Sequence, residues 1–170
     1  MDLASMIRDV PDFPVEGILF KDITTLIKDA DAFRQAVDEL VSHYEDRDID
    51  AVAAIESRGF IFGAPLAYQL GAGFIPVRKQ GKLPAEKISA EYTLEYGTNV
   101  LEMHTDAIEP GNKVLVIDDL IATGGSAKAT VEMVERLGGE VVGIAFLIEL
   151  TFLHGVEKLD GYDIFVMIKF

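Results

Sequence analysis

Two adjacent carboxylates, Asp118 and Asp119, directly follow a continuous apolar run at residues 114–117. Such a run is typical of a strand buried on both faces, which would deliver the two carboxylates to its C-terminal tip. A carboxylate accepts hydrogen bonds and donates none. The pair therefore suits sugar hydroxyls or a hydrated cation and cannot itself bind a phosphate group.

A loop suited to phosphate follows the acidic pair. Its glycines, Gly124 and Gly125, let the backbone approach a ligand closely, and free N–H groups at the start of the next helix favour an anion. Thr123 and Ser126 add hydroxyl donors. A phosphate loop beside an acidic pair predicts a site for a phosphorylated ribose. The alternative is a strand, an acidic turn and a capped helix that bind nothing.

The commoner nucleotide motifs are absent from the sequence. The Walker pattern GxxxxGK[ST] does not occur. The segment Gly71-Ala72-Gly73 lacks the third glycine of a dinucleotide fingerprint, because Pro76 occupies that position.

The cations of this acidic chain gather in one segment. The chain has 15 Lys and Arg against 29 Asp and Glu, a formal charge of −14, and a pI near 4.5. This balance argues against sequence-independent binding to nucleic acid or to an anionic membrane. Residues 78–87 reverse it, with four Lys and Arg residues against Glu86 alone. The reversal favours a site for a small polyanion, and an ordinary solvated loop is the alternative.

An α/β domain would position these residues. A length of 170 residues corresponds to one domain, at roughly 150 residues per domain. Strands are predicted at 51–55, 74–77, 114–117, 141–148 and 163–168. Helices are predicted at 31–44, from the end of the segment 56–59 to about 70, and at 125–137. Two more strands are predicted within 91–103, around a turn at 96–99. This alternation predicts a mainly parallel sheet flanked by helices, with ligands beyond the carboxyl ends of its strands.

The composition also indicates the compartment. The chain has no cysteine, its N-terminus lacks the apolar stretch of a signal peptide, and its longest apolar run, 141–148, is far shorter than the ~20 residues that span a bilayer. We therefore expect a cytoplasmic protein with neither a membrane nor a nucleic acid as partner.

Residues 114–126 resemble the 5-phosphoribosyl-1-pyrophosphate (PRPP) signature of the type I phosphoribosyltransferases. Four further segments, 13–23, 56–60, 77–84 and 94–97, resemble the adenine phosphoribosyltransferases in particular, in the same order along the chain. The resemblance implies a single domain over residues 1–170 with the type I phosphoribosyltransferase fold. Its twisted parallel sheet would carry a small N-terminal hood for the base, at about 1–30, and a flexible β-hairpin loop, at about 78–105.

The resemblance also implies the reaction. The phosphoribosyl group of PRPP would pass to adenine, giving AMP and pyrophosphate in purine salvage, with Mg²⁺ carried in by PRPP rather than held by a direct protein ligand. A homodimer is implied as well. Asp118 and Asp119 would face the ribose hydroxyls and stabilise an oxocarbenium-like transition state. The loop that would hold the 5′-phosphate comprises Ala122, Thr123, Gly124, Gly125 and Ser126.

The remaining roles follow from the same resemblance. Glu95 would handle a proton of the adenine ring, and Arg58 would act as a second catalytic residue by neutralising the leaving group. The pyrophosphate-binding residues would be Glu56, Ser57, Arg58, Arg78, Lys79 and Lys82, with a cis peptide bond between Glu56 and Ser57. The adenine-binding residues would be Leu19, Phe20, Lys21 and Leu150. A surface carboxylate is the alternative for Glu95, and plain core packing is the alternative for Phe20 and Leu150.

Three other functions compete with this one. A phosphoribosyltransferase for xanthine or hypoxanthine would keep the same PRPP site. A non-catalytic PRPP-sensing regulator would need a basic face for nucleic acid, which the charge of −14 disfavours. A structural α/β domain would use the glycine-rich loop only as a helix cap.

Overall fold

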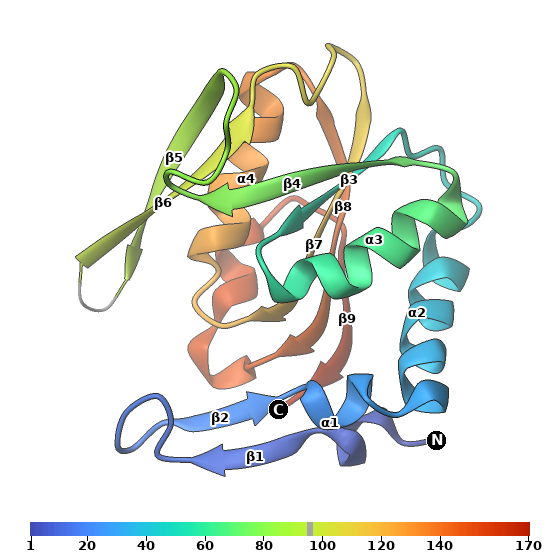
Figure 1. The fold of residues 1–170 in the computed structure, drawn as a ribbon, viewed down its shortest axis with the longest axis vertical. Coiled ribbons are helices and arrows are strands. Elements are labelled where there is room, and N and C mark those ends of the chain that lie inside the picture. The colour runs from blue at the N-terminus through green and yellow to red at the C-terminus, as the bar shows by residue number, and fades with distance from the viewer. Residues whose placement is uncertain (95–96) are drawn as a thin grey trace. The chain divides into compact units, whose positions relative to one another are not determined.

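The computed structural model describes residues 1–94 and 97–170, which form two compact units, Met1–His43 and Tyr44–Phe170. Figure 1 shows the order of their helices and strands along the chain. None of the helices in the described part of the chain is long and apolar enough to cross a membrane.

The first unit is built around a short antiparallel hairpin. Its elements are the 3-10 helix η1 (Leu3–Met6), β1 (Arg8–Pro11), β2 (Leu19–Asp22), α1 (Thr24–Ile27) and α2 (Ala30–Tyr44), which runs to the boundary of the unit. Ion pairs join the two strands, with Lys21 Nζ 2.6 Å from Asp9 Oδ1 and Arg8 bonded to Asp22. Helix α2 matches the helix predicted at 31–44, because its buried residues recur every three or four positions.

The second unit contains a seven-stranded sheet. Its strands are β3 (Ala51–Ile55), β4 (Gly73–Lys79), β5 (Lys87–Leu94), β6 (Gly97–His104), β7 (Lys113–Ile121), β8 (Glu140–Glu149) and β9 (Ile164–Lys169), in the order β5-β6-β4-β3-β7-β8-β9. Strands β4, β3, β7, β8 and β9 are parallel to one another. The hairpin β5–β6 joins the edge of β4 in antiparallel fashion. The mixed α/β class with a mainly parallel sheet is thus confirmed.

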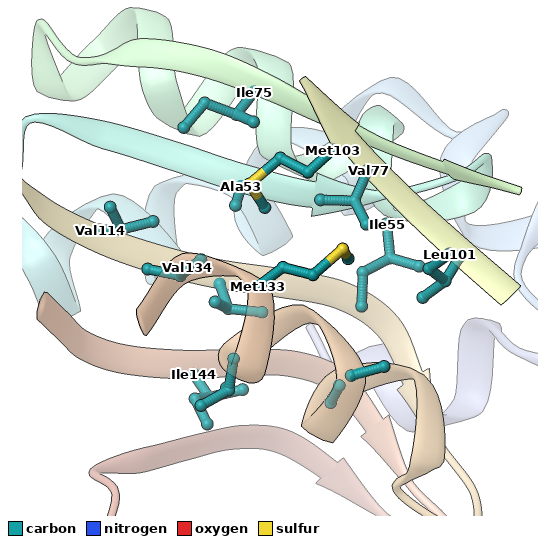
Figure 2. Packing of buried hydrophobic residues seen from close by; sticks show 14 of the residues in the cluster. Ala53, Ile55, Ile75, Val77, Leu101, Met103, Val114, Met133, Val134 and Ile144 are labelled. Carbon is teal, nitrogen blue, oxygen red and sulfur yellow. The ribbon is translucent and has the colours of Figure 1, made fainter. Parts of the chain in front are cut away.

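Helices cover both faces of this sheet. Helix α3 (Arg58–Leu70) packs so closely that a Cβ at Gly63 would lie 2.6 Å from the Cβ of Ala54. Side chains alternate along a strand, so Ala53 and Ile55 point to the opposite face. There they pack in one core cluster with Met133 of α4 (Gly125–Arg136), as Figure 2 shows. Burial on both faces explains why the central strands read as continuous apolar runs.

One local prediction is wrong. The turn expected at 96–99 would have separated the two strands of the hairpin, yet β6 already begins at Gly97, which pairs with Leu94 of β5. Residues 97–99 therefore belong to a strand. Gly97 has a φ of 100°, a conformation that favours glycine and that explains why a glycine stands at the start of β6.

Two short 3-10 helices complete the second unit, η2 (Thr151–Leu153) and η3 (Gly155–Leu159). They connect β8 to β9. Figure 1 shows η3 beside the loop that leads from β7 into α4, and the close approach of Gly155 to Ala122 and Gly124 agrees with this placement.

Candidate active site

A cavity of about 320 Å³ lies beyond the carboxyl ends of β3 and β7. It brings together three segments that are far apart in the sequence: the end of β3, the end of β7 and the loop leading into α4. The predicted site residues that line it are Glu56, Ser57, Arg58, Lys79, Asp118, Asp119, Ala122, Thr123, Gly124, Gly125 and Ser126. Strand ends of a parallel sheet meet at one edge, which accounts for this convergence.

The acidic pair is buried. Asp118 and Asp119 lie within β7, which continues to Ile121 instead of ending at residue 117 as predicted. Asp118 Oδ1 accepts a hydrogen bond from the backbone N–H of Asp119 at 2.8 Å. The first turn of α3 covers Asp118, since a Cβ at Gly59 would lie 3.1 Å from Asp118 Oδ1. A glycine at position 59 therefore leaves just enough room for the carboxylate.

The two carboxylates differ in their partners. Arg58 Nε donates to Asp119 Oδ2 at 2.6 Å, and this arginine side chain remains about half exposed at the cavity. Burial tends to lower the pKa of Arg58, but the adjacent Asp119 carboxylate raises it above its ordinary value. Burial and the negative charge of Asp119 together raise the pKa of Asp118 well above its usual range. The resting site thus favours one negative charge rather than two.

We expect the stability of the protein to depend on pH through Asp118. The carboxyl group of Asp118 binds its proton more tightly in the folded protein than in the unfolded chain, where its pKa is about 4. The resulting stabilisation is therefore fully present below about pH 4 and is lost as the pH rises through the raised pKa. Asp118→Asn removes the ionisable group, so the free energy of unfolding of this variant should fall less between pH 5 and pH 8 than that of the wild type.

Urea unfolding at pH 5 and pH 8 measures this effect. The asparagine Oδ1 can still accept the backbone hydrogen bond at position 119, so the fold should persist. Asp106→Asn, at an exposed turn, is the matched control for the aspartate-to-asparagine change itself. A wild type and an Asp118→Asn variant with the same pH dependence would contradict the raised pKa.

The phosphate loop is shaped by close backbone contacts. Gly124 has a φ of 87° and directly precedes α4, and as a glycine it has no side chain to cap the first N–H groups of the helix, which can therefore bind an anion. A Cβ at Gly124 would lie 2.5 Å from the carbonyl oxygen of Gly155, and a Cβ at Gly155 would lie 2.4 Å from the carbonyl oxygen of Ala122. The loop thus rests directly on the start of η3.

The basic side chains near the cavity share a buried counterion. Arg78 Nε donates to Glu56 Oε2 at 2.7 Å, and Lys82 Nζ donates to Glu56 Oε1 at 2.6 Å. Burial tends to raise the pKa of Glu56, but the hydrogen bonds from Lys82 and Arg78 outweigh it and hold the pKa below its ordinary value. The Glu56–Ser57 peptide bond is cis, as the resemblance implied. Lys79 lines the cavity, whereas Arg78 and Lys82 are not among its lining residues.

The other predicted residues lie elsewhere or outside the described chain. Glu95 is one of the two residues that the structure does not describe. In the first unit, Leu19 to Lys21 form most of β2, and the Phe20 ring packs edge-on against Phe13 with centroids 5.1 Å apart. In the second unit, the N–H of Leu150 donates to the carbonyl oxygen of Ile121 at 3.1 Å, which ties Leu150 to the end of β7.

Two residues of the site were not identified from the sequence. Tyr92 of β5 lines the cavity, and Gly155 supports the phosphate loop. Because side chains alternate along a strand, the position of Tyr92 in β5 could have indicated that its side chain lies on the face of the hairpin toward the site. Nothing local marks Gly155, because its role depends on a loop that approaches from another part of the chain.

Comparisons with known proteins agree with this geometry. The phosphoribosyl transferase domain family matches residues 24–169. Adenine phosphoribosyltransferase from Alkaliphilus metalliredigens is 59% identical over 170 residues, 100% of both chains. The crystal structure of the adenine phosphoribosyltransferase from Thermoanaerobacter pseudethanolicus is 58% identical, covers 99% of this chain and 98% of its own, and superposes with a TM-score of 0.96. The adenine phosphoribosyltransferase structure from Saccharomyces cerevisiae, complexed with an imino-altritol bisphosphate and adenine, is 41% identical and has a TM-score of 0.92. The match covers 98% of this chain and 96% of the yeast chain.

Proposed function

We infer the function of this chain from one premise: it belongs to the phosphoribosyltransferase family. It is a transferase that moves the 5-phosphoribosyl group of PRPP to adenine, giving AMP and pyrophosphate. The observation that carries this conclusion is the cavity at the ends of β3 and β7, where an acidic pair, an arginine and an uncapped glycine loop meet. These are the groups that a phosphorylated ribose with an anionic leaving group requires.

The phosphate loop and the acidic pair would hold the ribose 5-phosphate. The N–H groups of Gly124, Gly125 and Ser126 and the hydroxyls of Thr123 and Ser126 suit the 5′-phosphate, with the dipole of α4 behind them. Asp118 and Asp119 would accept hydrogen bonds from the ribose hydroxyls. Their negative charge would also stabilise the positive charge that develops at C1′ as the bond to pyrophosphate breaks.

The end of β3 would bind the leaving pyrophosphate. Ser57 and Arg58 line the cavity, and Lys79 lines it from β4. The carboxylate of Glu56 cannot bind pyrophosphate, since it only accepts hydrogen bonds. We infer that Glu56 contributes through its backbone and uses its carboxylate to keep Arg78 and Lys82 close to the site.

Magnesium fits this site as part of the substrate. In the described part of the chain, no group of three or more His, Cys, Asp or Glu side chains is placed to hold a metal ion. We propose that Mg²⁺ enters with PRPP, because Mg²⁺ usually keeps substrate phosphates and water as ligands. When bound, it would neutralise charge on the pyrophosphate. The side chains available beside it are Asp118 and Asp119.

The residues that would bind the base are proposed from the resemblance. We propose main-chain contacts from Leu19 and Lys21, with Phe20 and Leu150 packing on the base. A backbone carbonyl accepts a hydrogen bond from the 6-amino group of adenine, whereas hypoxanthine presents a carbonyl there and would leave both groups unpaired. Glu95 remains the candidate to accept the proton that adenine loses at N9. A homodimer and a cytoplasmic location also stay proposals, based on the resemblance and the composition.

A panel of purine bases tests the proposed function. The protein is incubated with PRPP, Mg²⁺ and either adenine, hypoxanthine, guanine or xanthine, and nucleotide formation is followed by chromatography. We expect AMP from adenine and at least about 10³-fold lower kcat/KM for each oxopurine, because unpaired polar groups in a buried site are costly. A parallel reaction with EDTA in place of Mg²⁺ should give little AMP.

The outcomes separate the competing functions. Nucleotide formed only from hypoxanthine, guanine or xanthine would overturn the choice of base and keep the transferase. No nucleotide from any base, with PRPP still bound in a calorimetric titration, would favour the PRPP-sensing regulator. No nucleotide and no PRPP binding would favour the structural domain.

A further inference from the structure

A second cavity adjoins the candidate active site. It has a volume of about 240 Å³ and lies between β5 and α4. Its lining consists of Glu91, Tyr92, Thr93, Gly125, Lys128, Ala129, Glu132 and Lys158. Within the described residues, Tyr92 and Gly125 are the only two that line both this cavity and the active-site cavity.

The ring of Tyr92 forms the side-chain part of this shared wall. A Cβ at Gly125 would lie 3.0 Å from Cδ2 of Tyr92 and 3.3 Å from its Cβ, so the tyrosine lies directly on the glycine backbone. Gly125 has no side chain to contribute. The backbone of Tyr92 is fixed opposite Asn99 in the hairpin, and its side chain is partly buried. The wall therefore consists of one aromatic ring against one stretch of backbone.

The chemistry of the two cavities differs. Four of the residues that line the second cavity are charged, namely Glu91, Lys128, Glu132 and Lys158. A polar cavity of this size holds water. The first cavity is where we place C1′ of PRPP, an electrophilic carbon that water can attack as well as adenine. Water must therefore be kept from this carbon while the reaction proceeds.

We propose that the Tyr92 ring is a partition that keeps the water of the second cavity away from the reacting carbon. Tyr92 is in this sense a positioning residue that sets the ratio of transfer to hydrolysis. In the hydrolysis it prevents, a water oxygen forms a bond to C1′, the bond from C1′ to pyrophosphate breaks with its electron pair on the pyrophosphate, and the water proton passes to solvent. The products are ribose 5-phosphate and pyrophosphate. The inference rests on the proposed transferase function.

Three variants test the partition. Tyr92→Ala removes the ring, Tyr92→Phe keeps the ring without its hydroxyl, and Thr93→Ala alters the next residue, which lines only the second cavity. The readout is the ratio of ribose 5-phosphate to AMP formed from PRPP, adenine and Mg²⁺. We expect Tyr92→Ala to raise this ratio about tenfold or more, because a wall that excludes water is lost. Tyr92→Phe and Thr93→Ala should stay within about twofold of the wild type.

The outcomes distinguish the partition from a merely structural role and from the proposed function itself. An unchanged ratio in Tyr92→Ala, even with a lower kcat, would overturn the partition. A Tyr92→Phe variant that hydrolyses PRPP like Tyr92→Ala would also overturn it, since the hydroxyl and not the ring would then matter. If circular dichroism shows that Tyr92→Ala does not fold, Tyr92→Leu replaces it with the same expected direction. A wild type that makes no AMP would overturn the proposed function instead.

Discussion

Replacing Asp118 and Asp119 together by asparagine is expected to lower kcat/KM for PRPP by about 10³-fold while the fold survives, the size of effect that loss of transition-state charge stabilisation produces. The two carboxyl groups are buried at the point where we place C1′, and the double substitution removes the negative charge that they carry in the resting site. Asparagine keeps the shape and the hydrogen-bond acceptor of each side chain but removes the charge. Steady-state kinetics with PRPP and adenine give kcat/KM, and circular dichroism verifies the fold.

The single variants Asp118→Asn and Asp119→Asn should each lower kcat/KM by less than the double variant. Asp119→Asn should cost about 10²-fold or more, because it also removes the negative charge that pairs with Arg58. The two single effects should not multiply to the double one, since the residues are adjacent and share one hydrogen-bond network. Asp106→Asn is again the exposed control. A double variant with wild-type kinetics would rule out the ribose role of the acidic pair.

Gly155→Ala should raise the KM for PRPP about 10²-fold, because a displacement of about 1 Å in a binding loop is enough for a change of that size. The added Cβ would lie 2.4 Å from the carbonyl oxygen of Ala122 and 3.1 Å from the backbone nitrogen of Gly124. Both contacts are with backbone, so the phosphate loop must move. Initial rates at varied PRPP and saturating adenine give the KM.

Gly73→Ala is the matched control for this substitution. Neither Gly155 nor Gly73 has a positive φ, so alanine is compatible with the backbone at both positions. A Cβ at Gly73 would meet its nearest neighbour, the carbonyl oxygen of Asp50, at an ordinary 3.7 Å. Gly73→Ala should therefore leave the KM unchanged. An unchanged KM in Gly155→Ala as well would show that the loop does not depend on this contact.

The sequence predicts the centre of the site well because that centre depends on a simple rule. Residues 51–55 and 114–117 are continuous apolar runs, and such runs become central parallel strands whose carboxyl ends meet. Arg58 and the acidic pair each follow one of these runs, so their convergence follows from the fold class. Helices α2 and α4 were also predicted to within a residue, because a clear apolar period marks each one.

The pairing of Glu56 with Arg78 and Lys82 depends on strand register, which composition does not reveal. Glu56 is 22 residues from Arg78 and 26 from Lys82 along the chain. The parallel pairing of Ile55 with Val77 brings the next residues of the two strands together. Once that register is known, the ion pair between Glu56 and Arg78 follows from it.

The hairpin of the first unit shows a different limit. Strands β1 and β2 have only four residues each, which is too short for a period to appear, and a loop at 12–18 with one proline and one glycine separates them. Ion pairs between their charged side chains mark the pairing instead. The contact between Gly155 and Ala122 was equally beyond prediction, because it joins two loops that have no regular pattern.

The closely packed glycines of the phosphate loop also bear on drug resistance. An inhibitor that mimics a phosphate at this loop would be held by backbone N–H groups, which every substitution except one to proline leaves in place. Escape would require a new side chain at Gly124, Gly125 or Gly155, and each of these positions leaves no more than 3.0 Å for a Cβ. A substitution that displaced the inhibitor there would also deform the loop that the substrate needs, so resistance would have to arise elsewhere in the site.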